Sequence, residues 1–210
     1  MDLDSVLRRA RARGEDVVFR ERLDPAPARL ARLARVALRI HVLDELRIGP
    51  SPAVARLVLG AGLSVRTVHA VHALLTPERA ALVDAEGART YAEVDRAINR
   101  TAHALRDELG VGRGTSVALA AENSAAYVIA WFALMRLGAR AVHASYRSRP
   151  AELEYLVDHA NVRAMLVSDA SIEAARAVAR TRPSLTLVAA GRDAGGALRL
   201  DDLAARARPT

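Results

Sequence analysis

Residues 90–145 read TYAEVDRAINRTAHALRDELGVGRGTSVALAAENSAAYVIAWFALMRLGARAVHAS, and this stretch decides the fold class. Its first four residues, Thr90 to Glu93, have the Ser/Thr-x-x-Glu spacing of a capping box, which satisfies free backbone N–H groups in the first turn of a helix. Apolar residues then recur at steps of three and four until Gly110, a residue suited to a left-handed helix end. The pattern predicts an amphipathic helix between Thr90 and Gly110.

A short strand and a second helix are predicted next. Residues 116–120 are apolar and long enough only for a strand, and Asn123 or Ser124 is placed to cap a helix that ends at Gly138. Every residue from 125 to 135 is apolar, so we expect this helix to be covered on nearly all sides and to form the centre of the core. A membrane span needs about 20 apolar residues, and this run is too short for one.

The alternation of strands and helices continues along the chain. Strands are predicted at residues 139–144, 164–167 and 185–188, and helices from Pro150, over residues 171–180 and over residues 200–207, with a glycine-rich loop at 191–196. Strands separated by helices of this length imply right-handed crossovers. The predicted fold is therefore α/β, with a mostly parallel sheet and helices on both of its faces.

These segments, in this order, resemble the early part of the adenylate-forming enzymes, which are the acyl-CoA synthetases and related AMP-forming ligases. The resemblance covers roughly residues 80–210. It is carried by residues 90–95 with 98–100, 117–119 with 122–124, 137–139 and 149–153. The chain departs from the family pattern at Ser145, where many members carry an asparagine.

The resemblance implies a reaction in which ATP, with Mg²⁺, activates a carboxylic or fatty acid and the acyl group passes to coenzyme A, releasing AMP and pyrophosphate. In the family, a phosphate loop rich in Ser, Thr and Gly ends near a lysine, and a second lysine offsets charge at the reacting carboxylate. All 31 basic residues of this chain are arginine. We therefore expect no catalytic residue and no tight binding of these cofactors here, and we expect the reading frame to continue into a lysine-bearing loop.

The candidate ligand contacts follow from the predicted sheet. Ligands of open parallel sheets lie beyond the carboxyl ends of the strands. This position selects residues 121–123 after one strand and Ser145, Tyr146 and Arg147 after the next. Helix capping by Asn123 and loop packing by Tyr146 are the competing structural roles, and neither segment is predicted to be catalytic.

The sequence divides into residues 1–75, a basic and mostly helical extension, and residues 76–210, a partial AMP-binding synthetase domain of the α/β type. Within the extension, four arginines recur at steps of three or four residues, opposite leucine, alanine and isoleucine: Arg29, Arg32, Arg35 and Arg39. This basic amphipathic helix either packs its leucines on the main domain or lies on an anionic membrane surface.

Composition excludes several other classes of function. The arginines are spread along the chain and only 3% of residues are aromatic, so no nucleic-acid partner is expected. There is no cysteine and no apolar signal segment at the start, which favours a cytoplasmic location, with or without peripheral membrane contact. His69 and His72 lie one helical turn apart, but no further ligands accompany them, so surface or capping histidines are expected rather than a metal site.

Two other interpretations of the whole chain remain open at this point. It could be a non-catalytic interaction or regulatory protein derived from the synthetase family. It could also be a peripheral membrane-binding module whose main task belongs to its first 75 or so residues. The interpretation that we favour is the N-terminal portion of an AMP-forming acyl-CoA synthetase, with neither the phosphate loop nor a catalytic lysine in these 210 residues.

Overall fold

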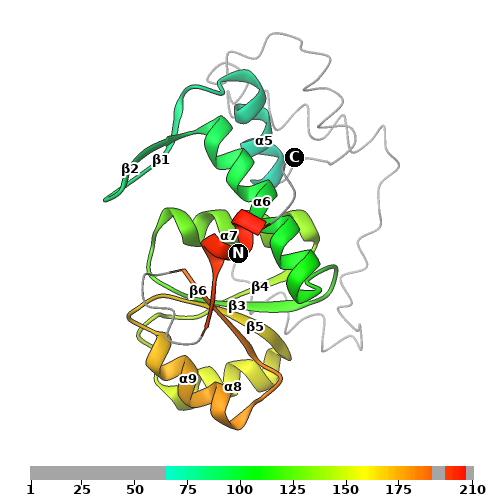
Figure 1. The fold of residues 1–210 in the computed structure, drawn as a ribbon, viewed down its shortest axis with the longest axis vertical. Helices are drawn as coiled ribbons and strands as arrows, with labels where there is room; N and C mark the ends of the chain where they lie inside the picture. Colours follow the sequence, from blue (N-terminus) through cyan, green and yellow to red (C-terminus); the bar gives the residue numbers. More distant parts are fainter. Residues whose placement is uncertain (1–64, 191–196, 207–210) are drawn as a thin grey trace, which may run out of the picture. The chain divides into compact units, whose positions relative to one another are not determined.

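A computed structural model describes residues 65–190 and 197–206, all of which belong to one compact unit of the chain (Figure 1). The predicted helix bearing Arg29, Arg32, Arg35 and Arg39 and the glycine-rich loop at 191–196 lie outside the described residues. The elements are, in order, α5 (Val65–Leu75), β1 (Ala80–Asp84), β2 (Gly87–Thr90), α6 (Tyr91–Leu109), β3 (Ser116–Ala120), α7 (Ala125–Leu137), β4 (Arg140–His143), α8 (Pro150–Ala160), β5 (Val162–Val167), α9 (Ile172–Thr181), β6 (Thr186–Ala189), β7 (Leu198–Arg199) and α10 (Leu200–Arg206).

The centre of the fold is a five-stranded sheet with the order β4-β3-β5-β6-β7. Every pair of neighbouring strands in it is parallel. Strand β3 is buried along its whole length, with Val117 opposite Ala141 of β4 on one side and Ala164 of β5 on the other. The predicted α/β fold with a parallel sheet is confirmed.

Helices cover both faces of this sheet, as Figure 1 shows. Val117 and Leu119 of β3 belong to one buried cluster with residues of α6, α7 and α10. Ala118 and Ala120, which alternate with them, belong to a second cluster with residues of α8 and α9. Because both faces of β3 are covered, its sequence is a continuous apolar run rather than an alternating one.

The helix ends confirm the predicted caps. Thr90 and Glu93 form a reciprocal capping box at the start of α6, and Gly110 ends it in the left-handed conformation. Ser124, not Asn123, caps α7: its hydroxyl accepts a hydrogen bond from the Tyr127 N–H at 3.2 Å. The remaining predicted strands and helices begin and end within two residues of their observed bounds.

Helix α7 is less buried than predicted. Ile129, Ala133 and Leu134 lie in the core, but the aromatic residues Tyr127, Trp131 and Phe132 are half-buried. No residue of α7 is exposed, so the helix is covered on all sides to some degree, although less completely than expected. Apolar composition alone does not require burial, because much of a folded protein's surface is apolar. This helix packs on α6 and on the sheet, and the rest of its circumference keeps partial contact with solvent.

The antiparallel hairpin of β1 and β2 was not predicted, since no strand was assigned between residue 76, where the main domain was expected to begin, and Thr90. Its turn is held by Asp84, whose carboxylate accepts hydrogen bonds from the Glu86 N–H at 3.0 Å and from the guanidinium of Arg89. The hairpin is largely exposed, and Val83 in β1 keeps 76% of its surface. A strand this exposed carries little of the apolar periodicity on which prediction depends.

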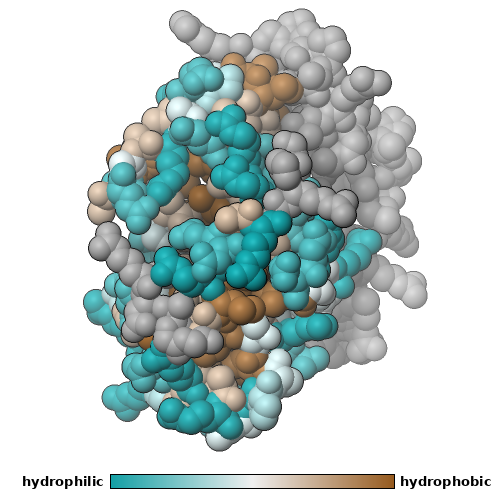
Figure 2. All heavy atoms as spheres, in the orientation of Figure 1, coloured by the Kyte–Doolittle hydropathy of each residue, from teal (hydrophilic) through white to brown (hydrophobic). Residues whose placement is uncertain are grey.

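The surface of the described part is mostly polar on the face shown in Figure 2, with an apolar patch beside α10 where β6 and β7 lie. Leu198 of β7 is 42% exposed. In the part of the chain that the structure describes, no helix combines the length and the apolar character that a bilayer crossing requires.

Candidate ligand edge of the parallel sheet

The candidate site lies along one edge of the sheet, because parallel strands all end on the same side. Three loops follow strands β3, β4 and β5 there: residues 121–124, 144–149 and 168–171. Strands β3 and β4 are neighbours, so the predicted segments 121–123 and 145–147 leave adjacent positions of this edge. The topology therefore brings the two predicted segments to the same end of the fold.

The loop after β3 leads into the N-terminus of α7. Ala121 is buried, whereas Glu122 and Asn123 are exposed and cap nothing. The Asp84 carboxylate of the hairpin accepts a hydrogen bond from the Ala125 N–H at 3.2 Å, and this bond is the main reason that the pKa of Asp84 is lowered. Two N–H groups at the start of α7 thus already have protein acceptors, from Ser124 and from Asp84.

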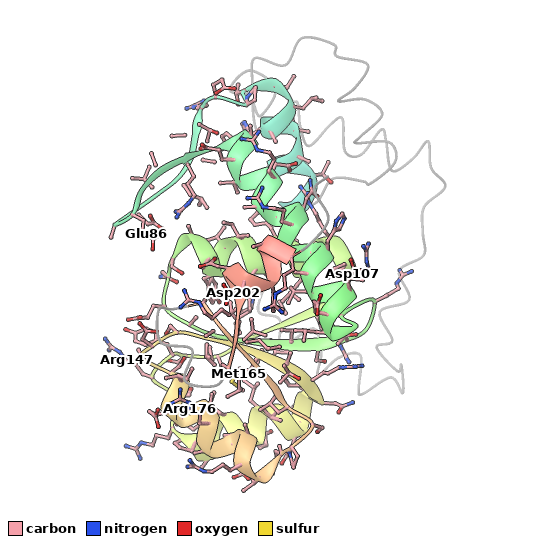
Figure 3. All side chains as sticks on the ribbon, viewed as in Figure 1. Glu86, Asp107, Arg147, Met165, Arg176 and Asp202 are labelled. Atoms are coloured by element: carbon pink, nitrogen blue, oxygen red, sulfur yellow. The ribbon has the colours of Figure 1, made fainter. Side chains whose placement is uncertain are left out.

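The loop after β4 contains the predicted residues Ser145, Tyr146 and Arg147. The Ser145 hydroxyl accepts a hydrogen bond from the Arg147 N–H at 3.2 Å, and the Ser148 N–H donates to the Ser145 carbonyl at 3.0 Å, so Ser145 shapes a tight turn. The guanidinium carbon of Arg147 lies 5.1 Å from the centre of the Tyr146 ring, within the range of a cation–π contact. Figure 3 shows Arg147 at the left-hand end of the sheet, and Arg176 of α9 at the same end.

The loop after β5 is tied to β3 by a buried serine that the sequence analysis did not single out. Ser171 is 1% exposed; its hydroxyl donates to the Ala120 carbonyl and accepts a hydrogen bond from the Ser168 N–H at 3.0 Å. The ends of two neighbouring strands are therefore fixed relative to each other. The position of Ser171 just before α9 indicated a helix cap in the sequence. Nothing in the sequence indicated its hydrogen bond to Ala120, 51 residues away.

Sequence reasoning also missed a polar pair at this edge. The Tyr127 hydroxyl lies 2.6 Å from Nδ1 of His143, and the Trp131 ring stands edge-on to His143 with ring centres 5.6 Å apart. Burial raises the pKa of Tyr127, and its phenol O–H can donate to Nδ1 in the tautomer of His143 that carries its proton on Nε2. The predicted topology could have indicated this pair, because the first turn of a crossover helix and the last residue of the next strand both lie at the carboxyl edge of the sheet.

The histidines of α5 do not have the expected exposure. His69 is 8% exposed, so its assignment to the surface is wrong, and His72 is half-buried with its ring stacked on Tyr91 at 4.9 Å. Over residues 65–190 and 197–206, no three His, Cys, Asp or Glu side chains gather into a group that could bind a metal ion. The described part of the edge thus offers hydroxyls, one imidazole, arginines and the carboxylates of Glu122 and Asp84, a mixed set suited to contacting polar ligands.

Comparison with known proteins decides the family. A family profile described as AMP-binding enzyme matches residues 70–208. This chain belongs to the AMP-binding enzyme family. The predicted resemblance to adenylate-forming enzymes is confirmed, and the match begins within α5, ahead of the hairpin.

CoA ligases and a fatty acid transport protein are among the relatives. A medium/long-chain-fatty-acid–CoA/3-oxocholest-4-en-26-oate–CoA ligase of Mycobacterium marinum is 36% identical over 98 residues, which is 47% of this chain and 17% of the relative. Long-chain fatty acid transport protein 2 of Rattus norvegicus is 35% identical over 106 residues, covering 50% of this chain and 17% of the relative. The aligned part of the chain thus spans about a sixth of the length of each of these relatives.

Solved structures of the family share the fold. The apo structure of MbtA from Mycobacterium smegmatis superposes with a TM-score of 0.65 and 28% sequence identity, covering 78% of this chain and 32% of that protein. The five-stranded parallel sheet with helices on both faces is therefore an arrangement that this chain shares with a longer protein.

Proposed function

We propose that residues 76–210 form the opening α/β portion of an ATP-dependent acyl-CoA synthetase, with residues 1–75 as a basic extension. The complete reaction would join a carboxylic or fatty acid to coenzyme A, using ATP and Mg²⁺ and releasing AMP and pyrophosphate. Membership of the AMP-binding family supports this proposal, as do the fatty-acid–CoA ligases among the relatives.

In that reaction this portion serves as a scaffold. The side chains at the ligand edge are largely engaged in holding the fold: Ser124 and Asp84 cap α7, Ser145 shapes a turn, and Ser171 joins two strand ends. The observation that carries the proposal is that the chain contains no lysine, the residue type that the family uses to stabilise its phosphate and carboxylate charges. We therefore expect the 210-residue chain, by itself, to form no acyl-adenylate.

A chimera tests the scaffold role. The segment of the Mycobacterium marinum ligase that aligns with this chain is replaced by the 98 matched residues, and CoA-ligase activity is measured with a fatty acid. We expect activity within about tenfold of the parent enzyme, since the segment supplies packing rather than catalytic groups. A control chimera with Leu119→Asp places a charge in the middle of the buried central strand and should be inactive.

The isolated chain is assayed in parallel for acid-dependent pyrophosphate release. Release from pure protein would contradict the expected lack of catalysis. A chimera that is soluble and folded but inactive would contradict the scaffold role. It would favour the alternative, a non-catalytic interaction protein derived from the AMP-binding family.

A further inference from the structure

Helices α5, α6 and α7 meet at a partly buried polar cluster. His69 comes from α5, Asp95 and Asn99 from α6, and Arg136 from α7. The Arg136 guanidinium donates hydrogen bonds to the Asn99 side-chain carbonyl and to the Asp95 carboxylate. The Asn99 side-chain amide also donates to Asp95, at 3.4 Å. The carboxylate of Asp95 is thus already bonded by two groups of the cluster.

His69 differs from the other members of this cluster because its Nε2 atom has no hydrogen-bond partner. Its Nε2 is buried and lies 3.6 Å from the nearer Asp95 oxygen, which is longer than a hydrogen bond. The ring lies against two aromatic rings, Phe132 with centres 5.1 Å apart and Tyr91 with centres 5.7 Å apart. The rings keep water from the imidazole, which favours its neutral form, while the Asp95 carboxylate favours its charged form.

The charges that face His69 come from all three helices. Burial, the largest effect, lowers its pKa; Asp95 of α6 opposes this, while Arg136 of α7 and His72 of α5 reinforce it. The net effect is a pKa below the ordinary value of 6.5. Protonation is therefore disfavoured while α5 is packed, and it becomes easier when α5 opens and the ring reaches water.

We propose that His69 makes the packing of α5 on α6 and α7 sensitive to acid. A histidine whose pKa is lowered by folding contributes stability that is fully present above its unfolded pKa. That contribution is lost as the pH falls below 6.5 towards the value in the packed state. Because α5 connects residues before 65 to the hairpin and the sheet, acid loosens this connection while the sheet itself stays folded.

Hydrogen exchange on the full 210-residue chain at pH 7 and pH 5, corrected for the intrinsic exchange rates, tests this inference. Helix α9, which contains no histidine, is the internal reference. If the opening of α5 frees a single histidine to bind a proton, the equilibrium constant for that opening can rise by at most about 25-fold between pH 7 and pH 5. We expect a rise of several-fold or more for α5 and none for α9.

Three variants assign the effect to His69. His69→Gln should remove the acid response of α5, whereas His72→Gln, one turn along the same helix, should keep most of it, because His72 has the smallest effect on His69. Arg136→Gln should shrink the response, because a neighbouring positive charge is gone and Asp95 is free to pair with the imidazolium. Arg136→Gln still tests the inference if the His69→Gln variant does not fold. Equal behaviour of α5 and α9 in the unsubstituted chain, or an unchanged acid response in His69→Gln or Arg136→Gln, would overturn the inference.

Discussion

Ser171 shows how one buried hydroxyl can hold the ligand edge together. Replacing it by alanine leaves the Ala120 carbonyl and the Ser168 N–H without this partner. Leaving a buried polar group unsatisfied costs about 1–3 kcal/mol, so we expect Ser171→Ala to lower the free energy of unfolding by about 2 kcal/mol. Urea denaturation followed by the fluorescence of Trp131, the single tryptophan, measures this value.

Ser145→Ala is the matched control, because Ser145 is exposed and water can replace its bond to the Arg147 N–H. Its effect should stay within about 0.5 kcal/mol. Equal losses for the two variants would mean that the contact between the loop after β5 and the end of β3 contributes nothing measurable.

The contrast between these serines also shows which part of the site was predictable. Ser145, Tyr146 and Arg147 follow a strand directly, so the strand pattern alone placed them at the carboxyl edge. Ser171, Asp84 and the pair of Tyr127 with His143 act through partners between 16 and 51 residues away. Hydrogen bonds at such separations are set by tertiary packing, and no local periodicity records them.

At the scale of the element, the end of α7 depends on backbone conformation at Gly138. Its φ is +67°, and a Cβ placed there would meet nothing closer than Arg113 Cγ at 3.7 Å, an ordinary contact. The cost of Gly138→Ala therefore comes from the left-handed backbone alone, and we expect about 1–2 kcal/mol less stability in the same urea assay.

Gly112→Ala provides the comparison, because Gly112 lies outside the left-handed region and has open space around it. We expect it to be neutral within about 0.5 kcal/mol. A Gly138→Ala variant as stable as Gly112→Ala would show that the chain ends α7 equally well without a left-handed glycine.

The elements from Thr90 onward were predictable because local chemistry and tertiary fold agree there. The capping box of α6 and the glycines after α6 and α7 mark helix ends whatever the packing. The hairpin of β1 and β2 and the two-residue strand β7 lack such marks: both are short, and their pairing depends on contacts made elsewhere. The partly buried side of α7 could not be identified for a related reason, since an all-apolar run does not tell which side faces the sheet.

Across the whole molecule, charge is distributed unevenly along the sequence. Residues 1–80 contain 14 arginines against 9 acidic residues, and residues 81–210 contain 17 against 15. We propose that the four arginines of the predicted amphipathic helix, Arg29, Arg32, Arg35 and Arg39, attach the chain to anionic membranes. Each would contribute about 1 kcal/mol near such a surface, and salt would screen it.

Sedimentation with vesicles containing phosphatidylserine checks this proposal. Binding should weaken as salt rises and should vanish when the four arginines are changed to glutamate. The matched control carries the same change of charge at exposed arginines of the α/β part, Arg96, Arg100, Arg147 and Arg180, and should still bind. Equal binding by the two variants, or no binding by the unsubstituted chain, would favour a helix that packs its leucines on the main domain.

The order of strands in the sheet also bears on how the chain folds during synthesis. Strand β3 is made first among the five; β4 then pairs on one side of it, β5 on the other, and β6 and β7 each add to the strand before them. No later strand has to insert between two that are already paired. The sheet can therefore grow outward from β3 as the polypeptide leaves the ribosome, because each new strand pairs with one that has already been made.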